Sequence, residues 1–157
     1  MTWEKTQEAL KKQGCQMLTI PEFIEFLKFT RKNYPEIFED ITVVRDPWRT
    51  EWLDAYFKEE KGQMYIYTRN TKKREKLDKD TLMEDKLPGI DFNDLFSNST
   101  KQGLPKLNVK AGVLYYWYPR NGTVAGFGAD SDRANLGCNG NPRGSSSALG
   151  VRPAKKF

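Results

Sequence analysis

The sequence contains no histidine and only two cysteines, and these shortages exclude several kinds of functional site. Metal centres that use histidine are excluded, and two cysteines cannot supply the four ligands of a structural zinc site. Cys138 follows Ala134 and Leu136 at every second position, a pattern that favours a buried free thiol, while a disulfide with Cys15 stays open. We therefore expect neither a metal ion nor a cofactor.

Long apolar segments are missing as well. No apolar run approaches the roughly 20 residues that a membrane-spanning helix needs, and residues 1–5 are charged and lack the apolar core of a signal peptide. We expect no membrane span. The localisation stays unknown, with the cytoplasm as the default and surface display by another route as the alternative. At 157 residues, 13% of them aromatic, the chain predicts one globular domain over residues 1–157.

Positive charge is unevenly distributed along the chain. Residues 101–157 contain nine Lys or Arg and two Asp, whereas residues 1–100 contain 17 Lys or Arg and 19 Asp or Glu. A basic C-terminal segment is one signature of nucleic-acid binding. These cations are scattered singly, however, with no basic helix among them, so nucleic acid is an unfavoured partner.

Two helices are predicted near the N-terminus. Trp3 to Lys12 has an amphipathic pattern that ends near Gly14. Thr19-Ile20-Pro21-Glu22 is a capping box with proline in the first turn, so a second helix should run from Ile20 to Asn33 and end before Tyr34-Pro35.

Strands are predicted to follow these helices. Ile41 to Arg45 is rich in β-branched residues and is bounded by a proline. Thr50–Lys58 and Gln63–Arg69 form a predicted hairpin around a turn that contains Gly62. A helix over Trp52–Phe57 is the alternative by propensity.

Further along, the patterns become shorter. Asn70–Lys86 is charged and weakly patterned, which predicts a surface loop. Asp91 is placed to cap a short helix through Phe96. Leu114–Tyr118 is an aromatic strand, and the turn signal Asn121-Gly122 predicts a return strand over Thr123–Ala125.

The composition changes over residues 124–151. This segment contains no Lys, Glu, Gln, Met, Trp, Ile or Thr and is rich in Gly, Ser, Asn, Asp and Arg. Alternation places Ala134, Leu136 and Cys138 on a buried face, which predicts an ordered segment rather than a linker. Asn135, Gly137 and Asn139 then lie on the exposed face. The apolar anchors of the segment are Phe127, Ala134, Leu136, Cys138, Leu149 and Val151.

Two chemical motifs are incomplete in this segment. Gly126-Phe127-Gly128 lacks the third glycine and the helix of a dinucleotide-binding fingerprint. Asp130 and Asp132 are hard-cation ligands by type, but the alternating-acid loop with its terminal glutamate is absent. We favour turn and framework roles for both, with Asp132 hydrogen-bonded or paired to an arginine.

The chain resembles the variable proteins of archaeal, specifically nanoarchaeal, diversity-generating retroelements. The similarity spans the chain from about residue 50 and rests on long motifs. Those in the C-terminal segment are Phe127, Ser131-Asp132-Arg133-Ala134, Leu136, Cys138, Pro142, Ser145 and Ala148-Leu149-Gly150-Val151-Arg152. Those upstream are Trp52-Leu53-Asp54, Met83-Glu84-Asp85, Gln102-Gly103-Leu104-Pro105 and Leu114-Tyr115-Tyr116-Trp117-Tyr118-Pro119-Arg120.

The resemblance implies an α+β, C-type lectin-like fold with two N-terminal helices, a small mixed or antiparallel sheet and an ordered, loop-rich C-terminal variable region. Residues 1–123 would be scaffold, and residues 124–157 the variable region with a closing strand. Adenine-targeted mutagenesis of Asn-type codons reaches Gly, Ser, Asp, Asn, Arg, Tyr and Phe but not Lys, Glu, Gln, Met or Trp, and the missing residue types fit this rule. The implied ligand-binding positions are Gly126, Gly128, Asp130, Asn135, Gly137, Asn139, Gly140, Asn141, Arg143, Gly144 and Ser146.

The function expected from these observations is that of a ligand-binding display protein, not an enzyme, with a macromolecular partner such as a protein or a cell-surface component. One alternative is an enzyme of the formylglycine-generating type, whose paired reactive cysteines are absent here. The other is a calcium-dependent sugar-binding lectin. Its Glu-Pro-Asn or Gln-Pro-Asp motif is replaced by Asn141-Pro142-Arg143.

Overall fold

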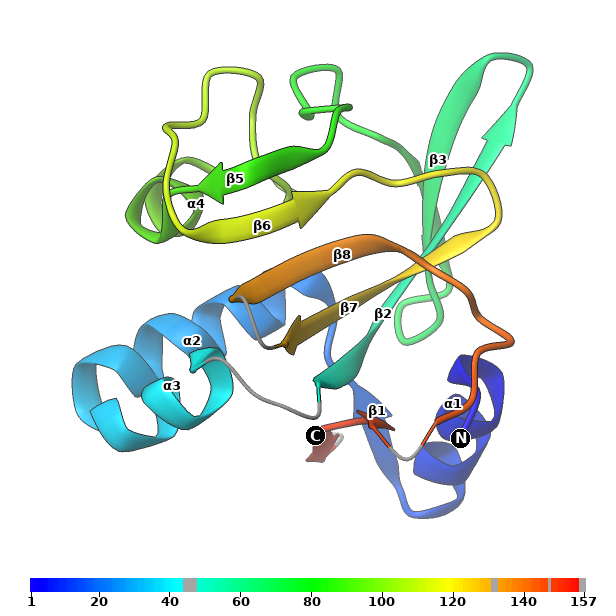
Figure 1. Cartoon of the computed structure of the whole chain (residues 1–157). Helices are drawn as coiled ribbons and strands as arrows, with labels where there is room; N and C mark the ends of the chain where they lie inside the picture. The colour runs from blue at the N-terminus through cyan, green and yellow to red at the C-terminus, as the bar shows by residue number, and fades with distance from the viewer. Residues whose placement is uncertain (44–47, 131–132, 147, 156–157) are drawn as a thin grey trace.

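The computed structural model describes residues 1–43, 48–130, 133–146 and 148–155. These residues form an α+β fold (Figure 1), as the sequence predicts. Four helices lie within them: α1 (Trp3–Lys12), α2 (Ile20–Asn33), α3 (Pro35–Thr42) and α4 (Phe92–Asn98). The strands are β1 (Cys15–Met17), β2 (Arg49–Glu60), β3 (Gln63–Thr68), β4 (Lys73–Lys76), β5 (Lys86–Ile90), β6 (Leu114–Trp117), β7 (Thr123–Ala129), β8 (Ala134–Gly140), β9 (Leu149–Gly150) and β10 (Pro153–Lys155).

The main sheet is mixed and has eight strands, larger than the small sheet expected. Its order is β4-β3-β2-β7-β8-β6-β5, and β9 adds to β2. Most neighbours are antiparallel, whereas β6 with β8 and β2 with β9 are parallel. A separate ribbon pairs β10 with β1, so the last strand closes against the N-terminal part of the chain, as expected. No helix in the described ranges is long and apolar enough to cross a membrane.

The two N-terminal helices have the predicted bounds because their ends are capped. Thr2 caps α1 by accepting a hydrogen bond from the backbone N–H of Lys5. The capping box of α2 is complete, since the hydroxyl of Thr19 accepts from Glu22 N and the Glu22 carboxylate accepts from Thr19 N at 2.9 Å. These bonds satisfy backbone donors that have no partner within the helix.

The strand predicted over Ile41–Arg45 is wrong where the structure describes it. Ile41 and Thr42 form the last turn of α3, while Val44 and Arg45 lie outside the described residues. Pro35 ends α2, but it also starts α3, because its fixed φ suits the first turn of a helix. Ile41 is buried in the core, so tertiary packing outweighs the β-branched propensity of this segment.

The hairpin of β2 and β3 is confirmed, and the helical alternative over Trp52–Phe57 is wrong. Its turn is formed by Lys61 and Gly62, whose φ angles of 50° and 78° fit the turn type that joins twisted strands. Within the predicted loop over Asn70–Lys86, β4 pairs with β3, so part of that loop is an edge strand.

The later elements follow the sequence more closely. Asp91 caps α4 by accepting from Asp94 N at 3.0 Å. The aromatic strand and the Asn121-Gly122 turn are present, and β7 continues to Ala129, four residues beyond the predicted strand. The alternation of residues 134–138 is confirmed as β8.

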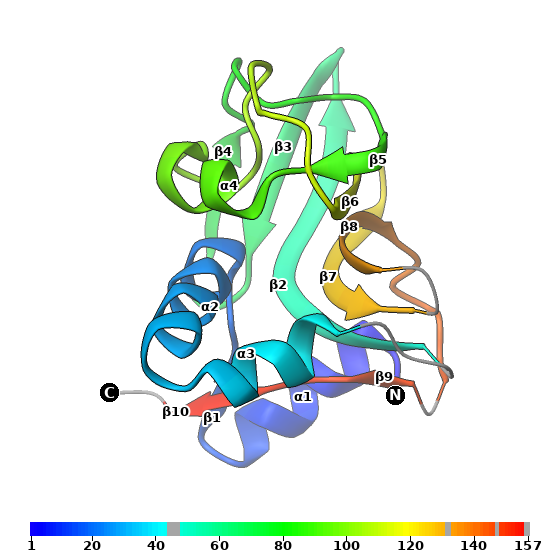
Figure 2. The ribbon, with the colours of Figure 1, turned by 60° about the vertical axis from the view of Figure 1, so that its left-hand side comes forward.

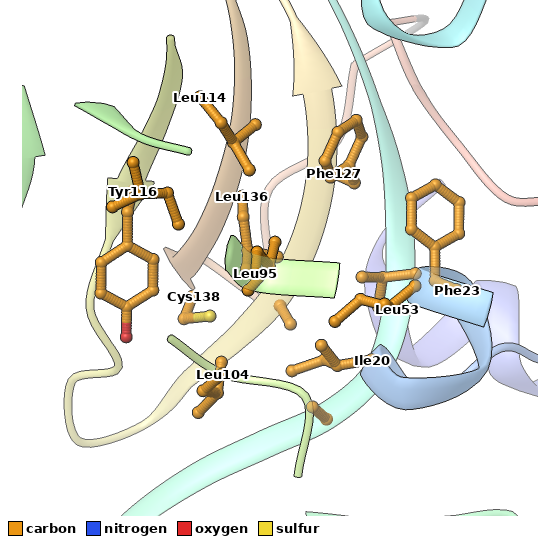
Figure 3. Packing of buried hydrophobic residues seen from close by; sticks show 14 of the residues in the cluster. Ile20, Phe23, Leu53, Leu95, Leu104, Leu114, Tyr116, Phe127, Leu136 and Cys138 are labelled. Carbon is orange, nitrogen blue, oxygen red and sulfur yellow. The ribbon is translucent and has the colours of Figure 1, made fainter. Parts of the chain in front are cut away.

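The core is divided between the two sides of the sheet. Figure 2 shows α4 and α2 one above the other along one side, with α1 and the β1–β10 ribbon at the lower end. The larger cluster packs α2 and α4 against the sheet, and Phe23 meets Phe127 with ring centroids 5.1 Å apart (Figure 3). A smaller cluster contains Trp3, Leu10, Met17, Trp52 and Val124.

Candidate functional site

The two faces of β7 and β8 carry different side chains. On one face Phe127, Leu136 and Cys138 are at most 2% exposed and point into the larger cluster (Figure 3). On the other face of β8, Asn135 and Gly137 are half-buried. This is the alternation predicted from the sequence, and it leaves the second face of β8 open to a ligand.

Two glycines lie between two tryptophans on this second face. Trp52 of β2 is opposite Gly126 of β7, Gly126 is opposite Gly137 of β8, and Gly137 is opposite Trp117 of β6. Residues directly opposite one another on paired strands share a face. The row therefore has large rings at its ends and no side chain in its middle, which produces a depression.

This depression has a volume of about 290 Å³, and none of the described residues that line it is charged. A size near the lower end of ligand sites suits one side chain or one small group of a larger partner. We call it the tryptophan hollow. Its lining comprises Trp48, Thr50, Trp52, Trp117, Gly126, Asn135, Gly137, Asn139, Gly140, Asn141, Gly144 and Leu149.

The three tryptophans of the hollow were not among the expected site residues. Trp52 is 4% exposed, and its indole N–H donates to the carbonyl of Met1 at 3.3 Å, so its ring is held by the frame. Trp48 is 45% exposed. Alternation along each predicted strand shows which neighbours share a face with Trp52 or with Trp117, but it does not relate the two strands to each other. Only the strand pairing shows that both tryptophans border the same depression.

Most of the positions implied to bind the ligand converge on the hollow. The polar side chains of Asn135, Asn139 and Asn141 and the backbone of Gly137 meet there, although they come from β8 and the turn after it. Amide side chains offer donors and acceptors together, which suits adaptable recognition. The seven positions that line it are Gly126, Asn135, Gly137, Asn139, Gly140, Asn141 and Gly144.

The glycines of this set differ in whether a side chain fits. A Cβ at Gly137 would have only side-chain atoms near it, the closest at 3.5 Å. A Cβ at Gly128 would lie 2.4 Å from Thr50 Oγ1 and 2.5 Å from the carbonyl oxygen of Arg49. A Cβ at Gly126 would lie 2.7 Å from Thr50 Cγ2, and a Cβ at Gly140 would lie 2.9 Å from the carbonyl oxygen of Val124.

The expectation of a solvent-facing position is therefore wrong for Gly126 and Gly128. Both are buried, because β2 packs closely against β7 there. Gly126 still borders the hollow through its backbone, whereas Gly128 does not. Leu149 is half-buried rather than buried, and it lines the hollow. Val151 is half-buried too.

The remaining expected positions lie outside the hollow. Asp130 is half-buried at the end of β7, and its Oδ1 accepts from the backbone N–H of Arg133 at 3.1 Å. Ser146 is exposed, and its hydroxyl accepts from Ala148 N. Arg143 is exposed and borders a different cavity. The role expected for Asp132 falls outside the described residues.

Two titratable groups of the packed face have shifted pKa values. Burial raises the pKa of the Cys138 thiol and also that of Tyr116, whose hydroxyl donates to the Leu82 carbonyl at 2.8 Å. Cys138 and Cys15 are both free thiols. Within the described ranges, no three carboxylate or cysteine side chains gather in a group that would hold a metal ion.

No protein-family model matches the sequence, and searches of curated proteins and of solved structures return no match.

Proposed function

We propose that the protein is a ligand-binding display protein of a diversity-generating retroelement, with a C-type lectin-like frame. Its tryptophan hollow is the centre of a variable surface that recognises a macromolecular partner. The mechanism is shape and hydrogen-bond complementarity without covalent chemistry.

One observation carries this proposal. The seven positions named above as lining the hollow are implied by the resemblance, from their place in the motif of the C-terminal segment. Nothing in that inference used their position in space. That they border one depression, beside three tryptophans from the constant part of the chain, supports a surface organised around a ligand.

The arrangement also supplies the two kinds of group that binding surfaces use. Tryptophans concentrate binding energy at interfaces, because they offer a large area with few rotatable bonds. The half-buried Trp117 and the exposed Trp48 supply this area from the scaffold, so it is present whichever residues occupy the variable positions. Asn135, Gly137 and Asn139 then decide which partner fits.

A binding role is supported over an enzymatic one by the state of the thiols. Cys138 is fully buried in the larger cluster, whereas Cys15 packs at the edge of the smaller one. A thiol whose pKa is raised by burial is a poor nucleophile. Among the residues of the hollow that the structure describes, none is an acid or a base that could transfer a proton.

A display experiment tests the proposal. The full chain is displayed on phage with Asn-type degenerate codons at Asn135, Gly137, Asn139 and Asn141, and the library is panned against purified proteins. Most clones should remain folded, and binders of micromolar or better affinity should emerge.

The matched control is a second library with the same codons at four exposed positions of one loop, Leu107, Asn108, Lys110 and Ala111, which lie outside the hollow. This library should give few binders. Equal numbers of binders from both libraries, or a hollow library that is mostly unfolded, would contradict the proposal.

A further inference from the structure

A second cavity lies between α1, the strands β2 to β4 and the turn around Pro142. Its volume is about 640 Å³, within the range of sites for small molecules. It shares no lining residue with the tryptophan hollow. We call it the basic groove. Its lining comprises Trp3, Glu4, Tyr56, Tyr67, Thr68, Arg69, Lys72, Lys73, Arg74, Pro142 and Arg143.

The charges around the groove are mostly positive. Among the described residues that line it, five are Lys or Arg and Glu4 is the one carboxylate. Glu4 pairs with Arg69 at 2.7 Å. Lys72, Lys73 and Arg143 have no carboxylate within 4.0 Å in the part of the chain that the structure describes. These three cations are available to an anion.

One wall of the groove is aromatic. Trp3 and Tyr56 have ring centroids 6.4 Å apart, and Tyr56 and Tyr67 are 6.2 Å apart at 66°. Trp3 is 5% exposed, whereas both tyrosines are half-buried and present part of their rings to the cavity. Tyrosine faces of this kind stack against planar rings, and the stacking tolerates different rings.

The groove is held in shape by the buried carboxylate of Asp54. Asp54 is 0% exposed and accepts hydrogen bonds of 2.9 Å from Gln7 Nε2, Arg69 N and Asn70 N. Burial nevertheless raises the pKa of Asp54. One side chain thus ties α1 to the turn that carries Lys72, and the turn is ordered before any ligand arrives. Such order lowers the entropy lost on binding.

We propose that the basic groove binds a nucleoside phosphate, either free or within a single-stranded nucleic acid. The base stacks on the ring of Tyr67 and meets Tyr56 with its edge, because the two rings are 66° apart, and the phosphate lies among Lys72, Lys73 and Arg143. A nucleoside phosphate joins a planar apolar ring to an anion over a short distance, which matches an aromatic wall beside unpaired cations. An acidic peptide carries its charge on flexible aliphatic stems and leaves the aromatic wall unused.

The test begins with binding to the full chain. Isothermal titration calorimetry with thymidine 5′-monophosphate, and fluorescence anisotropy with a labelled thymidine hexanucleotide, compare the free and single-stranded sources. Ribose 5-phosphate and a hexaglutamate peptide are the comparison probes. We expect the two nucleotide probes to bind, and ribose 5-phosphate to bind at least tenfold more weakly, because it lacks the stacking base.

Two variants locate the binding. Lys72→Gln/Lys73→Gln should lower the affinity for both nucleotide probes about tenfold and reduce the salt dependence of hexanucleotide binding. Its control, Lys79→Gln/Lys110→Gln, removes the same charge from two exposed lysines elsewhere and should change little. Tyr67→Leu, which keeps an apolar side chain in β3, should lower the affinity for the nucleotides about fivefold or more.

The control for Tyr67→Leu is Tyr34→Leu, at an exposed tyrosine outside the groove. Circular dichroism confirms that each variant is folded. Binding by the hexanucleotide alone assigns the site to single strands, and equal binding by the monophosphate assigns it to free nucleotides. The proposal is overturned if neither nucleotide binds, if ribose 5-phosphate binds as well as the monophosphate, if only hexaglutamate binds, or if both groove variants bind like their controls.

Discussion

The two faces of β7 and β8 show how one segment can carry both stability and recognition. Toward the larger cluster, Phe127, Leu136 and Cys138 fill the space between the sheet and the helices. Toward the other side, Gly126 and Gly137 leave space between two tryptophans. Because side chains alternate along a strand, the residues of β8 that point away from the larger cluster can change without disturbing it. A variable surface on strands therefore depends on an invariant face behind it.

The largest effect should come from shortening a side chain on the packed face. Leu136→Ala leaves a cavity where Leu136 is 2% exposed, and we expect a loss of about 2–5 kcal/mol in the free energy of unfolding. Denaturant unfolding measures it. Asn135→Ala, one residue away on the other face, is the control and should lose far less. Similar losses in the two variants would break the distinction between the faces.

A smaller effect should separate Gly128, which is confined by β2, from Gly137, which borders the hollow. Gly128→Ala brings a methyl group against Thr50 and the Arg49 carbonyl, and we expect a loss of about 1–3 kcal/mol from overpacking. At Gly137→Ala the three nearest atoms belong to side chains and lie 3.5 Å or more away, so stability should be unchanged or rise by up to about 1 kcal/mol. Thermal and denaturant unfolding of both variants would show whether only Gly137 tolerates variation.

Residues of the packed face should also make the free energy of unfolding depend on alkaline pH. Cys138 has a raised pKa, so above the ordinary value of 9.0 the unfolded chain releases this proton while the folded chain keeps it. The contribution of this thiol to the free energy of unfolding is therefore fully present below pH 9.0 and falls above it. The fall from this thiol is about 1.4 kcal/mol at pH 10. Unfolding at pH 7 and pH 10 measures the fall.

Cys138→Ala should reduce that fall, and Tyr116 should account for a further part at higher pH because burial raises its pKa as well. Cys15→Ala is the control and should show the same fall as the original chain. If Cys138→Ala is as sensitive to alkaline pH as Cys15→Ala, the thiol is accessible in the folded protein and the packed face is looser than described.

The smallest effect is expected on the open face of β8. Asn135→Tyr/Gly137→Ser/Asn139→Asp changes three residues that border the hollow, and the free energy of unfolding should stay within about 0.5 kcal/mol. Asn141 is left unchanged because its side-chain oxygen accepts from Arg143 N at 3.0 Å. A loss as large as that of Leu136→Ala would show that these residues serve the fold rather than a ligand.

Sequence patterns were sufficient where the information is local. The capping box at Thr19 and the helical spacing after it predict α2 to the residue, and alternation alone predicts the buried positions of β8. They failed at α3, where β-branched residues favoured a strand and packing of Ile41 favoured a helix. They also did not show that cations gather in space, since Lys72 and Arg143 border one groove although they lie far apart in sequence.

By itself, the sequence determined which residues of the C-terminal segment are anchors and which are restricted in type, because periodicity and composition are properties of the chain. Only the tertiary structure decided which of those residues form a site. Trp52 comes to lie opposite Gly126, and Trp117 opposite Gly137, through the pairing of β2, β7, β8 and β6. Gly128 is confined by β2, and nothing in its own sequence neighbourhood shows it. Both results follow from contacts between strands that are distant in the chain, which local patterns do not encode.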